Sequence, residues 1–480
     1  MGRSMEANPS FNIEQKPHHN CGVIGIVLDP SSRAEMMAEY LASALSDMQN
    51  RGDDSAGIAV LNPEFSMGYA DFGKVKDVLT TANISGLPDG LIGLGHDRYR
   101  TKGHRNEKHD YGVVSPFQQE GASGKVFWTA HNGQFNESPV ISTDTRGFVV
   151  EKVAPNYETT LESAVLKSLP SENGSAYSII FADESELLAF RDPVGFHPLV
   201  YGRSAEIGGW VVGSETPSLY NLGVDEEHIL PPGHMLRLMP GKDPEIKNFM
   251  QSTKDTQLCI LEGKYFARAD GQLEGRSIFE IRKNFGRELA KAEENIIEDA
   301  IVMAVPDSSR GAAEGFAYEL GLELHEGFVR ATTSRSFQQS TQDSRSSVAN
   351  KKLQSIKSQI KGKDIYLIED TLIRGTTMHQ VVAKLKNAKA GNIHLRIAAP
   401  PSKYTCKYGI DMPSEDELIA NTKSLQEIKE YIGLEEKDTI RYSDIEASRR
   451  ALGGELGKKA CTRCFTGQEV EYPTDFKSVG

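Results

Sequence analysis

The sequence predicts two folds in one chain: an α+β half built on antiparallel strands, followed by an α/β half built on parallel strands. From Cys21 to about Leu238, short apolar runs alternate with Gly- and Asn-rich turns, a pattern typical of antiparallel sheets. Further along, apolar runs alternate with amphipathic helical segments, which is typical of a mostly parallel sheet. A chain of 480 residues is also too long for one hydrophobic core.

Four apolar runs in the first half predict strands, and these are Gly22–Val27, Gly57–Val60, Tyr177–Phe181 and Gly209–Val212. A helix is expected where apolar residues recur on one face, at Met37, Leu41, Leu45 and Met48, and Arg51-Gly52 should end it. The polar stretch Met239–Gln257 contains two prolines and a glycine, so it is the predicted linker between the halves.

Strands and helices alternate in the second half. The predicted strands are Ile301–Val305, Ile365–Ile368 and Ile393–Ala399. One helix carries Ile281, Phe285 and Leu289 on its apolar face, and another carries Met378, Val381, Val382 and Leu385. The segment Ala331–Ser347 has no apolar periodicity and is rich in Ser, Thr and Gln, so we expect a loop able to close over a ligand.

Charge and composition exclude several classes of partner. The formal net charge of −13 leaves no basic surplus to neutralise phosphates, so neither a nucleic acid nor an anionic membrane is an expected partner. No stretch has the ~20 consecutive apolar residues of a membrane span. The polar first residues, Met1–Asn20, lack the apolar segment of a secretory signal, so we expect a cytoplasmic protein.

The segment from Ile365 to Thr377 has the order expected of a site for a phosphorylated ribose. A strand leads to the acidic pair Glu369-Asp370, which can accept hydrogen bonds from ribose hydroxyls and share a Mg²⁺ ion. The small-residue loop Thr371–Thr377 then begins a helix, where backbone N–H groups and hydroxyls can hold a 5′-phosphate. An ordinary strand-to-helix turn with a solvated acidic pair is the alternative.

The five cysteines fall into two groups. Cys21 opens an apolar strand and is a candidate nucleophile, with a buried structural cysteine as the alternative. Cys259, Cys406, Cys461 and Cys464 lie in the second half and end in a Cys-x-x-Cys pair. Outside a secretory context, four such thiols indicate a metal centre, for which ligand type and spacing leave zinc, an iron–sulfur cluster or unmetallated thiols open.

Motifs along the whole chain resemble one family. The run Ile365–Thr377 is similar to the phosphoribosyl-pyrophosphate (PRPP) motif of type I phosphoribosyltransferases. Earlier segments look like those of an N-terminal-nucleophile glutamine amidotransferase: Cys21-Gly-Val-Ile-Gly, Arg51-Gly-Asp-Asp-Ser-Ala-Gly, Gly95-His-Asp-Arg-Tyr, His131-Asn-Gly and Arg191-Asp-Pro-Val-Gly. With Tyr265-Phe-Ala-Arg, Val305-Pro-Asp-Ser and Tyr408-Gly-Ile-Asp they complete a resemblance to the glutamine phosphoribosylpyrophosphate amidotransferase family.

For the first half, the resemblance implies a four-layer αββα glutaminase domain at 21–245. Cys21 would be the nucleophile and its own α-amino group the base, so Met1–Asn20 would be a propeptide. Asn132 and Gly133 would form the oxyanion hole. The glutamine-binding residues would be Arg98, Thr101 and Glu158, where Glu158 stands in Tyr-Glu-Thr-Thr for the Asp of the family's Ser-Asp-Thr-Glu. Arg100 and Lys102 replace residues that are usually small.

For the second half, the resemblance implies an α/β type I phosphoribosyltransferase domain at 258–480, ending in a metal-cluster segment. Mg²⁺ would be held by Ser308, Glu369 and Asp370. The PRPP ligands would be Glu369, Asp370, Thr371, Arg374, Gly375, Thr376, Thr377, Arg335 and Lys352. One branch of the family carries a [4Fe–4S] cluster on cysteines at these positions, which favours that centre on Cys259, Cys406, Cys461 and Cys464.

The resemblance implies an amidophosphoribosyltransferase of purine synthesis. Cys21 would release ammonia from glutamine, and the ammonia would attack C1 of PRPP to give 5-phosphoribosylamine, glutamate and diphosphate. The implied partners are glutamine and PRPP, purine nucleotides as inhibitors, and further copies of the chain in a homo-oligomer. Two alternatives remain: an ammonia-using transferase with a degenerate glutaminase half, and a non-catalytic PRPP- or nucleotide-binding sensor.

Overall fold

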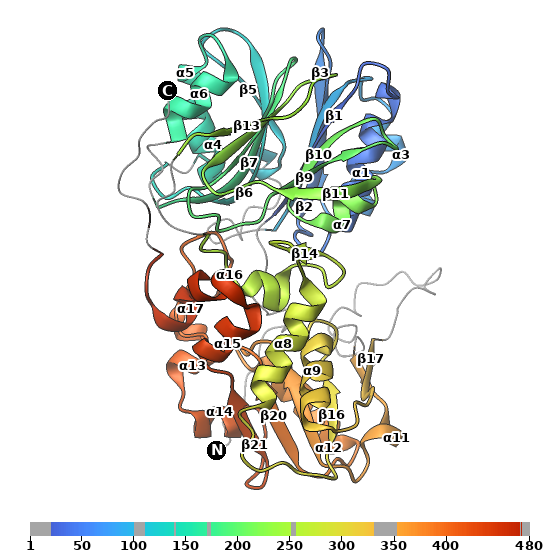
Figure 1. The fold of residues 1–480 in the computed structure, drawn as a ribbon, viewed down its shortest axis with the longest axis vertical. Coiled ribbons are helices and arrows are strands. Elements are labelled where there is room, and N and C mark those ends of the chain that lie inside the picture. The colour runs from blue at the N-terminus through green and yellow to red at the C-terminus, as the bar shows by residue number, and fades with distance from the viewer. Residues whose placement is uncertain are drawn as a thin grey trace, which may run out of the picture.

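The structure is a computed structural model that describes residues 21–99, 111–138, 141–169, 174–250, 256–330, 353–470 and 472. Figure 1 shows the two halves stacked along the long axis, with two facing sheets in the first half and a smaller sheet between helices in the second. The polypeptide leaves the first half after β13 and enters the second through the π-helix η5 (Glu262–Phe266).

The first half contains a seven-stranded antiparallel sheet in the order β11-β9-β10-β1-β4-β2-β3. Its strands are β1 (Gly22–Leu28), β2 (Ser55–Leu61), β3 (Ser66–Phe72), β4 (Ile92–Arg98), β9 (Val200–Ser204), β10 (Gly209–Gly213) and β11 (Val224–Ile229). One face packs on α1 (Met37–Asp47), α2 (Val75–Val78), α3 (Thr81–Ile84) and α7 (Thr216–Tyr220). The predicted helix is confirmed in α1, whose Met37, Leu41 and Leu45 are buried.

A six-stranded antiparallel sheet, β13-β12-β8-β7-β6-β5, faces the first one. Its strands are β5 (Phe117–Glu120), β6 (Val126–Gln134), β7 (Ala176–Ala182), β8 (Leu187–Arg191), β12 (His234–Leu238) and β13 (Glu245–Asn248). Apolar side chains from both sheets, such as Val23 and Ile180, form the core between them. The outer face packs on α4 (Asp144–Phe148), η3 (Val149–Val153), α5 (Ala154–Asn156) and α6 (Leu161–Ser168). The predicted αββα layering is therefore confirmed.

The second half contains a parallel sheet in the order β16-β19-β20-β21. The strands are β16 (Ile301–Ala304), β19 (Ile365–Glu369), β20 (Ile393–Ile397) and β21 (Thr439–Tyr442). Helices α8 (Ile278–Ala290) and α9 (Arg310–Leu320) cover one face, and α12 (Thr376–Asn387) and α14 (Leu425–Tyr431) cover the other. The α/β prediction is confirmed, with strands at the expected places.

Shorter elements complete the second half. Two hairpins pair β14 (Gln272–Leu273) with β15 (Arg276–Ser277) and β17 (Phe328–Arg330) with β18 (Leu353–Ser355). The remaining helices are α11 (Lys357–Ile360), α13 (Ile419–Thr422), α15 (Ile445–Leu452), α16 (Gly454–Lys459) and α17 (Arg463–Thr466). Figure 1 shows α15, α16 and α17, in red, beside α8 on the side of the second half that faces the first. Among the described residues, no helix is long and apolar enough to cross a membrane.

The stretch predicted as a linker, Met239–Gln257, contains the edge strand β13, which pairs with β12. β13 has only four residues, half-buried at its two ends and exposed at the two central positions, and its one apolar residue, Ile246, is exposed, so no buried apolar face marks the strand. The first sheet system therefore extends further along the chain than its apolar runs indicate.

Candidate active sites

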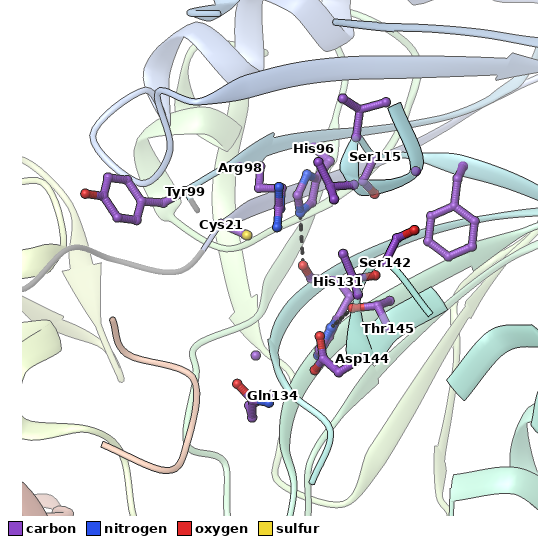
Figure 2. Close-up of a pocket in the computed structure, with 16 residues that line it drawn as sticks. Cys21, His96, Arg98, Tyr99, Ser115, His131, Gln134, Ser142, Asp144 and Thr145 are labelled. Carbon is purple, nitrogen blue, oxygen red and sulfur yellow. Dashed lines mark hydrogen bonds between the residues drawn. The ribbon is translucent and has the colours of Figure 1, made fainter. Parts of the chain in front are cut away.

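One cavity of about 110 Å³ lies between the two sheets of the first half. Cys21 and Arg98 reach it from the β1 and β4 side, and His131, Asp144 and Thr145 reach it from β6 and the start of α4, as Figure 2 shows. Gly133 also lines it. The fold thus brings together residues separated by more than a hundred positions in the sequence, because β1 and β4 are neighbours in one sheet and β6 lies opposite.

Cys21 is half-buried at this cavity, and its thiol does not ionise readily. Burial raises its pKa to about 12, although the positive charge of Arg98 acts against the rise. A thiol in such surroundings needs a base to remove its proton before it can attack a carbonyl. Cys21 also has a φ of 51°, a left-handed backbone conformation at the point where the chain enters β1.

Arg98 and Asp144 place opposite charges in the cavity. Arg98 ends β4, and its Nη1 is buried with no hydrogen-bond partner. Asp144 begins α4, where its Oδ2 accepts a hydrogen bond of 2.7 Å from the Phe135 N–H. Burial raises the pKa of Asp144, and the Phe135 bond and Arg98 oppose the rise. A guanidinium and a carboxylate in one small cavity suit the two charged groups of a free amino acid.

Asp144, rather than Glu158, is the carboxylate of this cavity. Glu158 is exposed and does not line the cavity, so the structure does not bring this predicted glutamine ligand to it. The segment Ser142-Thr143-Asp144-Thr145 supplies the carboxylate instead, and Thr143 caps α4 by accepting from the Arg146 N–H at 3.0 Å. Asp144 and Glu158 are fourteen positions apart in two similar Thr-containing segments, with no strand pattern between them. Their spacing in the sequence therefore could not show which one reaches the cavity.

Asn132 and Gly133 lie on β6 beside the cavity, as expected for an oxyanion hole. Both polar atoms of the Asn132 side chain are buried without a hydrogen-bond partner. Gly133 has a φ of 148°, and a Cβ at this position would lie 2.0 Å from the Ala176 carbonyl oxygen. Only glycine therefore fits where β6 passes β7.

Two buried histidines, His96 and His131, also face the cavity, and no role was predicted for either of them from the sequence. His96 Nε2 lies 3.0 Å from the His131 carbonyl oxygen, the dashed line in Figure 2. Burial lowers the pKa of His96 to about 3 and lowers that of His131 as well. Both rings are therefore neutral at ordinary pH, and neither adds a second cation beside Arg98.

In the second half, the acidic pair lies at the carboxyl end of β19, as predicted. Glu369 and Asp370 are each 2% exposed. Asp370 is held by the Ser308 hydroxyl, by the Thr371 hydroxyl at 2.9 Å, and through its N–H by Ser309 Oγ at 3.1 Å. Ser308 therefore meets Asp370 across 62 positions, which places the three predicted Mg²⁺ ligands at one edge of the sheet.

The loop after this pair wraps a small hollow of about 20 Å³ lined by Glu369 and residues 371–378. Gly375 has a φ of 78° and is the N-cap of α12, where a Cβ would lie 2.7 Å from Ile419 Cδ1. Arg374 donates from Nε at 3.1 Å and from Nη2 at 2.9 Å to Glu417 Oε1. The loop has the shape of an anion cradle, with its arginine held by a carboxylate.

The four remaining cysteines converge although they come from three parts of the chain. Cys259 and Cys461 form a parallel β-bridge, in which the Cys461 N–H donates to the Leu258 carbonyl at 2.9 Å. All four are free thiols packed in one apolar cluster. Burial raises the pKa of Cys259, and the thiols of Cys461, Cys406 and Cys464 raise it further. Among the described residues, no three His, Cys, Asp or Glu side chains are close enough to hold a single metal ion.

Three predicted ligands, Thr101, Arg335 and Lys352, lie outside the described residues, as do Arg100, Lys102 and the loop Ala331–Ser347. The residues that the sequence argument missed, Asp144 and the two histidines, all belong to the first cavity. A threonine cap before an aspartate was the available signal for Asp144. No local sequence pattern indicates that His96 and His131 are buried, because their burial arises only when the two sheets face each other.

Comparison with known proteins covers both halves of the chain. The phosphoribosyl transferase domain family matches residues 276–412. The chloroplastic amidophosphoribosyltransferase of Glycine max is 32% identical over 96% of this chain and 79% of its own. That of Methanothermobacter thermautotrophicus is 31% identical over 97% of each.

Solved structures give the same result. An allosteric regulatory enzyme of purine biosynthesis superposes with a TM-score of 0.82 at 28% identity, covering 95% of this chain and 98% of the other. The glutamine PRPP amidotransferase from B. subtilis, complexed with ADP and GMP, gives 0.80 at 28% identity, covering 95% and 99%. The chain belongs to the amidophosphoribosyltransferase family, the glutamine-using pentosyltransferases of de novo purine biosynthesis.

Proposed function

We propose that Cys21 and the Ile365–Thr377 motif carry the two half-reactions that convert glutamine, PRPP and water to 5-phosphoribosylamine, glutamate and diphosphate. One observation carries the proposal above all others: a thiol, a guanidinium and a carboxylate share one cavity in the first half of a chain whose second half holds the acidic pair and anion cradle. The first half thus offers a site suited to a free amino acid, and the second half offers one suited to a phosphorylated ribose.

Arg98 binds the α-carboxylate of glutamine and Asp144 binds its α-ammonium group. Arg98 Nη1 is a buried donor without a partner, so a carboxylate that reaches it recovers a lost charge-assisted hydrogen bond. This pair fixes the amino acid by both charged ends and leaves its side-chain amide to extend toward Cys21. Glutamine and asparagine differ by one methylene, so the distance from the pair to the thiol sets the selectivity.

Cys21 acts once residues 1–20 are removed and its α-nitrogen becomes a free amine. The amine accepts the thiol proton while Sγ bonds to the carboxamide carbon, and the carbonyl electrons move to oxygen. Asn132 Nδ2 and the Gly133 N–H stabilise that oxyanion. The proton passes to the leaving nitrogen, ammonia departs, and water hydrolyses the thioester to glutamate. The raised pKa of the thiol explains why a base is required.

Asp370 and Glu369 bind the ribose hydroxyls of PRPP, and residues 371–377 hold its 5′-phosphate. Ser308, Glu369 and Asp370 fit a Mg²⁺ ion by donor type, since hard oxygen ligands converge there. The ion supplies positive charge for the diphosphate leaving group. Arg335 and Lys352 are proposed to contact that group. Ammonia from the first half attacks C1 from inside the molecule, and the bond to diphosphate breaks.

A [4Fe–4S] cluster on Cys259, Cys406, Cys461 and Cys464 is our proposal for the metal centre. Cys259 and Cys464 are buried and Cys406 and Cys461 are half-buried, all in one apolar cluster, where the other three thiols raise the pKa of Cys259 beyond the effect of burial. Thiolates are the ligands that an iron–sulfur cluster would take there. Its proposed role is structural, tying the chain end to the start of the second half.

Regulation, assembly and location complete the proposal. One superposed structure is a complex with ADP and GMP, so purine nucleotides are proposed as inhibitors. A homo-oligomer is also proposed, because the chain belongs to the same family. All five cysteines are free, the state expected in a reducing compartment, so a cytoplasmic location is proposed.

The decisive experiment compares glutamine with ammonia as the nitrogen source, using anaerobically purified protein whose intact mass is measured. We expect glutamine-dependent product from protein that begins at Cys21. An electrophilic glutamine analogue should label Cys21, as peptide mapping would reveal. Product from ammonia alone would support the ammonia-using alternative, and binding of PRPP without turnover would support the sensor. Activity in protein that retains residues 1–20 would contradict the amine base.

The cluster is tested separately by metal analysis. Anaerobic protein should contain about four iron and four sulfide per chain and absorb broadly near 400 nm. A colourless protein with one zinc per chain would contradict the cluster while leaving both half-reactions intact.

A further inference from the structure

Asp97 is a buried carboxyl group directly behind the nucleophile. It is 0% exposed and lies on β4 between His96 and Arg98, which both face the glutamine cavity. Successive strand residues point to opposite faces, so Asp97 points away from the cavity, toward the layer covered by α1. A Cβ added at Gly22 would lie 2.2 Å from Asp97 Oδ1 and 3.3 Å from Met48 Cβ, which places the carboxyl on that face.

The two oxygens of Asp97 have different surroundings. Oδ1 accepts a hydrogen bond of 2.5 Å from the Gly22 N–H, and the strand register pairs Gly22 with Asp97. Oδ2 is buried and has no hydrogen-bond partner among the residues that the structure describes. An unpaired buried acceptor costs about 1–3 kcal/mol, so such an atom in a folded protein needs an explanation.

The nitrogen of Cys21 is the group best placed to supply that partner. Only the Cys21 Cα and carbonyl carbon separate it from the Gly22 nitrogen that already donates to Asp97. The charge of Asp97 also reaches the Cys21 thiol, whose pKa it raises. While the leader is attached, the Cys21 nitrogen is a neutral amide. Removal of residues 1–20 turns it into an amine that carries up to three protons.

We propose that Asp97 positions the free α-amino group of Cys21 and stabilises the ammonium ion that forms when this amine takes the thiol proton. The inference rests on the proposed N-terminal-nucleophile role of Cys21 and deepens it. Asp97 exchanges no atom with the substrate. It is therefore a positioning residue, with the relation to the amine that a buried aspartate has to the histidine of a serine hydrolase triad.

The charges around Asp97 fit this role. Burial raises the pKa of Asp97 well above its usual range and Glu215, which precedes α7, adds to the rise, while Arg51, which follows α1, and the Gly22 N–H oppose it. Arg51 is itself engaged by Glu215 at 2.5 Å and by Glu262 at 3.1 Å, so its charge is shared among carboxylates. On the cavity side, Arg98 and Asp144 face the thiol with opposite charges. A nearby ammonium ion would favour the charged form of Asp97.

Asp97→Asn tests the proposal through the pH profile of glutamine hydrolysis. A carboxylate beside an amine raises the amine pKa, so its loss lowers that pKa by about one unit. The acidic limb of kcat/KM should move to lower pH, because the amine becomes a free base earlier. The plateau should fall about ten- to a hundredfold, because the forming ammonium loses a charge-assisted partner.

A matched variant separates this effect from general damage to the domain. Asp183→Asn alters another buried aspartate of the same half, at the turn after β7, where it accepts bonds from Ser185, Glu186 and the Tyr157 hydroxyl. Its pH profile should match the unaltered enzyme. Ammonia-dependent synthesis should be unchanged in Asp97→Asn, which would demonstrate a folded second half.

Each outcome decides one point. A lowered plateau with an unmoved limb would make Asp97 merely structural and overturn the inference, as would a profile identical to that of the unaltered enzyme. If Cys21→Ala, in the same assay, still hydrolyses glutamine, the proposed nucleophile itself fails. If Cys21→Ala is inactive and Asp97→Asn moves both limb and plateau as described, the inference stands.

Discussion

The two sites of this chain differ in how their polar groups are satisfied before substrate arrives. Arg98 Nη1, in the glutamine cavity, and the side-chain amide of Asn132, beside it on β6, are buried without hydrogen-bond partners in the described part of the chain. In the PRPP motif, Arg374 is held by Glu417, and Asp370 by the hydroxyls of Ser308 and Thr371. The first site therefore presents polar groups that are unpaired before a ligand binds. The polar groups of the second site must leave their hydrogen-bond partners within the protein before they can bind a ligand.

This difference fits the two substrates. Glutamine is small and must present one amide to one thiol, so a rigid cavity lined by unpaired donors favours it without rearrangement. PRPP carries several negative charges that would repel Glu417 and Asp370 unless Mg²⁺ and arginine accompany it. We therefore expect substitutions in the first site to abolish function, and those in the second to tune affinity.

The largest expected effect follows from Cys21→Ala in protein produced without residues 1–20. Glutamine-dependent synthesis should fall to background, because the thiol that attacks the glutamine amide is gone. Ammonia-dependent synthesis should persist, since the PRPP motif lies in the other sheet system. Rates with each nitrogen source, on the same preparation, measure both. Loss of both activities in a folded variant would contradict the separation of the two sites.

The contact between the halves gives the next largest effect. Arg51, from the first half, pairs with Glu262 of η5 in the second, and both side chains are fully buried. Arg51→Met removes the cation that Glu262 and Glu215 share and leaves both buried carboxylates without that charge, which should lower the free energy of unfolding by about 3–5 kcal/mol. Urea denaturation followed by fluorescence measures it. Arg33→Met, which breaks the exposed Arg33–Glu35 pair, is the control and should leave the midpoint unchanged.

Asp370→Asn should weaken Mg²⁺-PRPP binding by about ten- to a hundredfold, because it removes one charge from a buried, hydrogen-bonded position. Isothermal titration or the KM for PRPP measures this change. Asp438→Asn is the control, since Asp438 is buried at the opposite end of the same sheet, where it accepts from the Ile393 N–H at 2.7 Å. Equal PRPP affinity in the two variants would contradict the phosphoribosyl assignment.

Periodicity and local motifs predicted most of the fold and much of the sites. The strands β1, β2, β7, β10, β16, β19 and β20 and the helices α1, α8 and α12 lie where apolar patterns placed them. Local order also predicted the acidic pair after β19, because strand, carboxylates and loop are contiguous. β13 was missed because a short polar edge strand has no apolar face to mark it.

Features that depend on distant pairing could not be predicted. Asp97 matters because β4 pairs with β1 and sets it beside Gly22, which no local pattern indicates. Glu158 was predicted as a glutamine ligand, whereas Asp144 lines the cavity. Both lie in Thr-containing segments, and only the facing of β6 and β4 across the cavity distinguishes them. The buried pair of Arg51 and Glu262 joins positions 211 residues apart.

The smallest expected effect is on PRPP affinity, and it follows from removing the charge of Glu417, the hydrogen-bond partner of Arg374. Glu417 accepts both Arg374 bonds, and its side chain also completes a capping box with Ser414. Burial raises the pKa of Glu417, but the Arg374 and Ser414 bonds outweigh burial and lower it overall. Glu417→Gln keeps the cap, because glutamine serves at the same helix position, and removes the charge that holds Arg374. A half-exposed pair contributes less than about 1 kcal/mol. PRPP affinity should therefore rise by no more than about fivefold.

The chain supplies a matched control for that small change. Glu427 forms the same capping box with Ser424 at the start of α14 and accepts no arginine bond in the described structure. Glu427→Gln should leave PRPP affinity unaltered, so the difference between the two variants isolates the Arg374 contact. If Glu417→Gln instead weakens PRPP binding while Glu427→Gln does not, the Arg374–Glu417 pair shapes the loop for the ligand, and Arg374 itself is not a phosphate ligand.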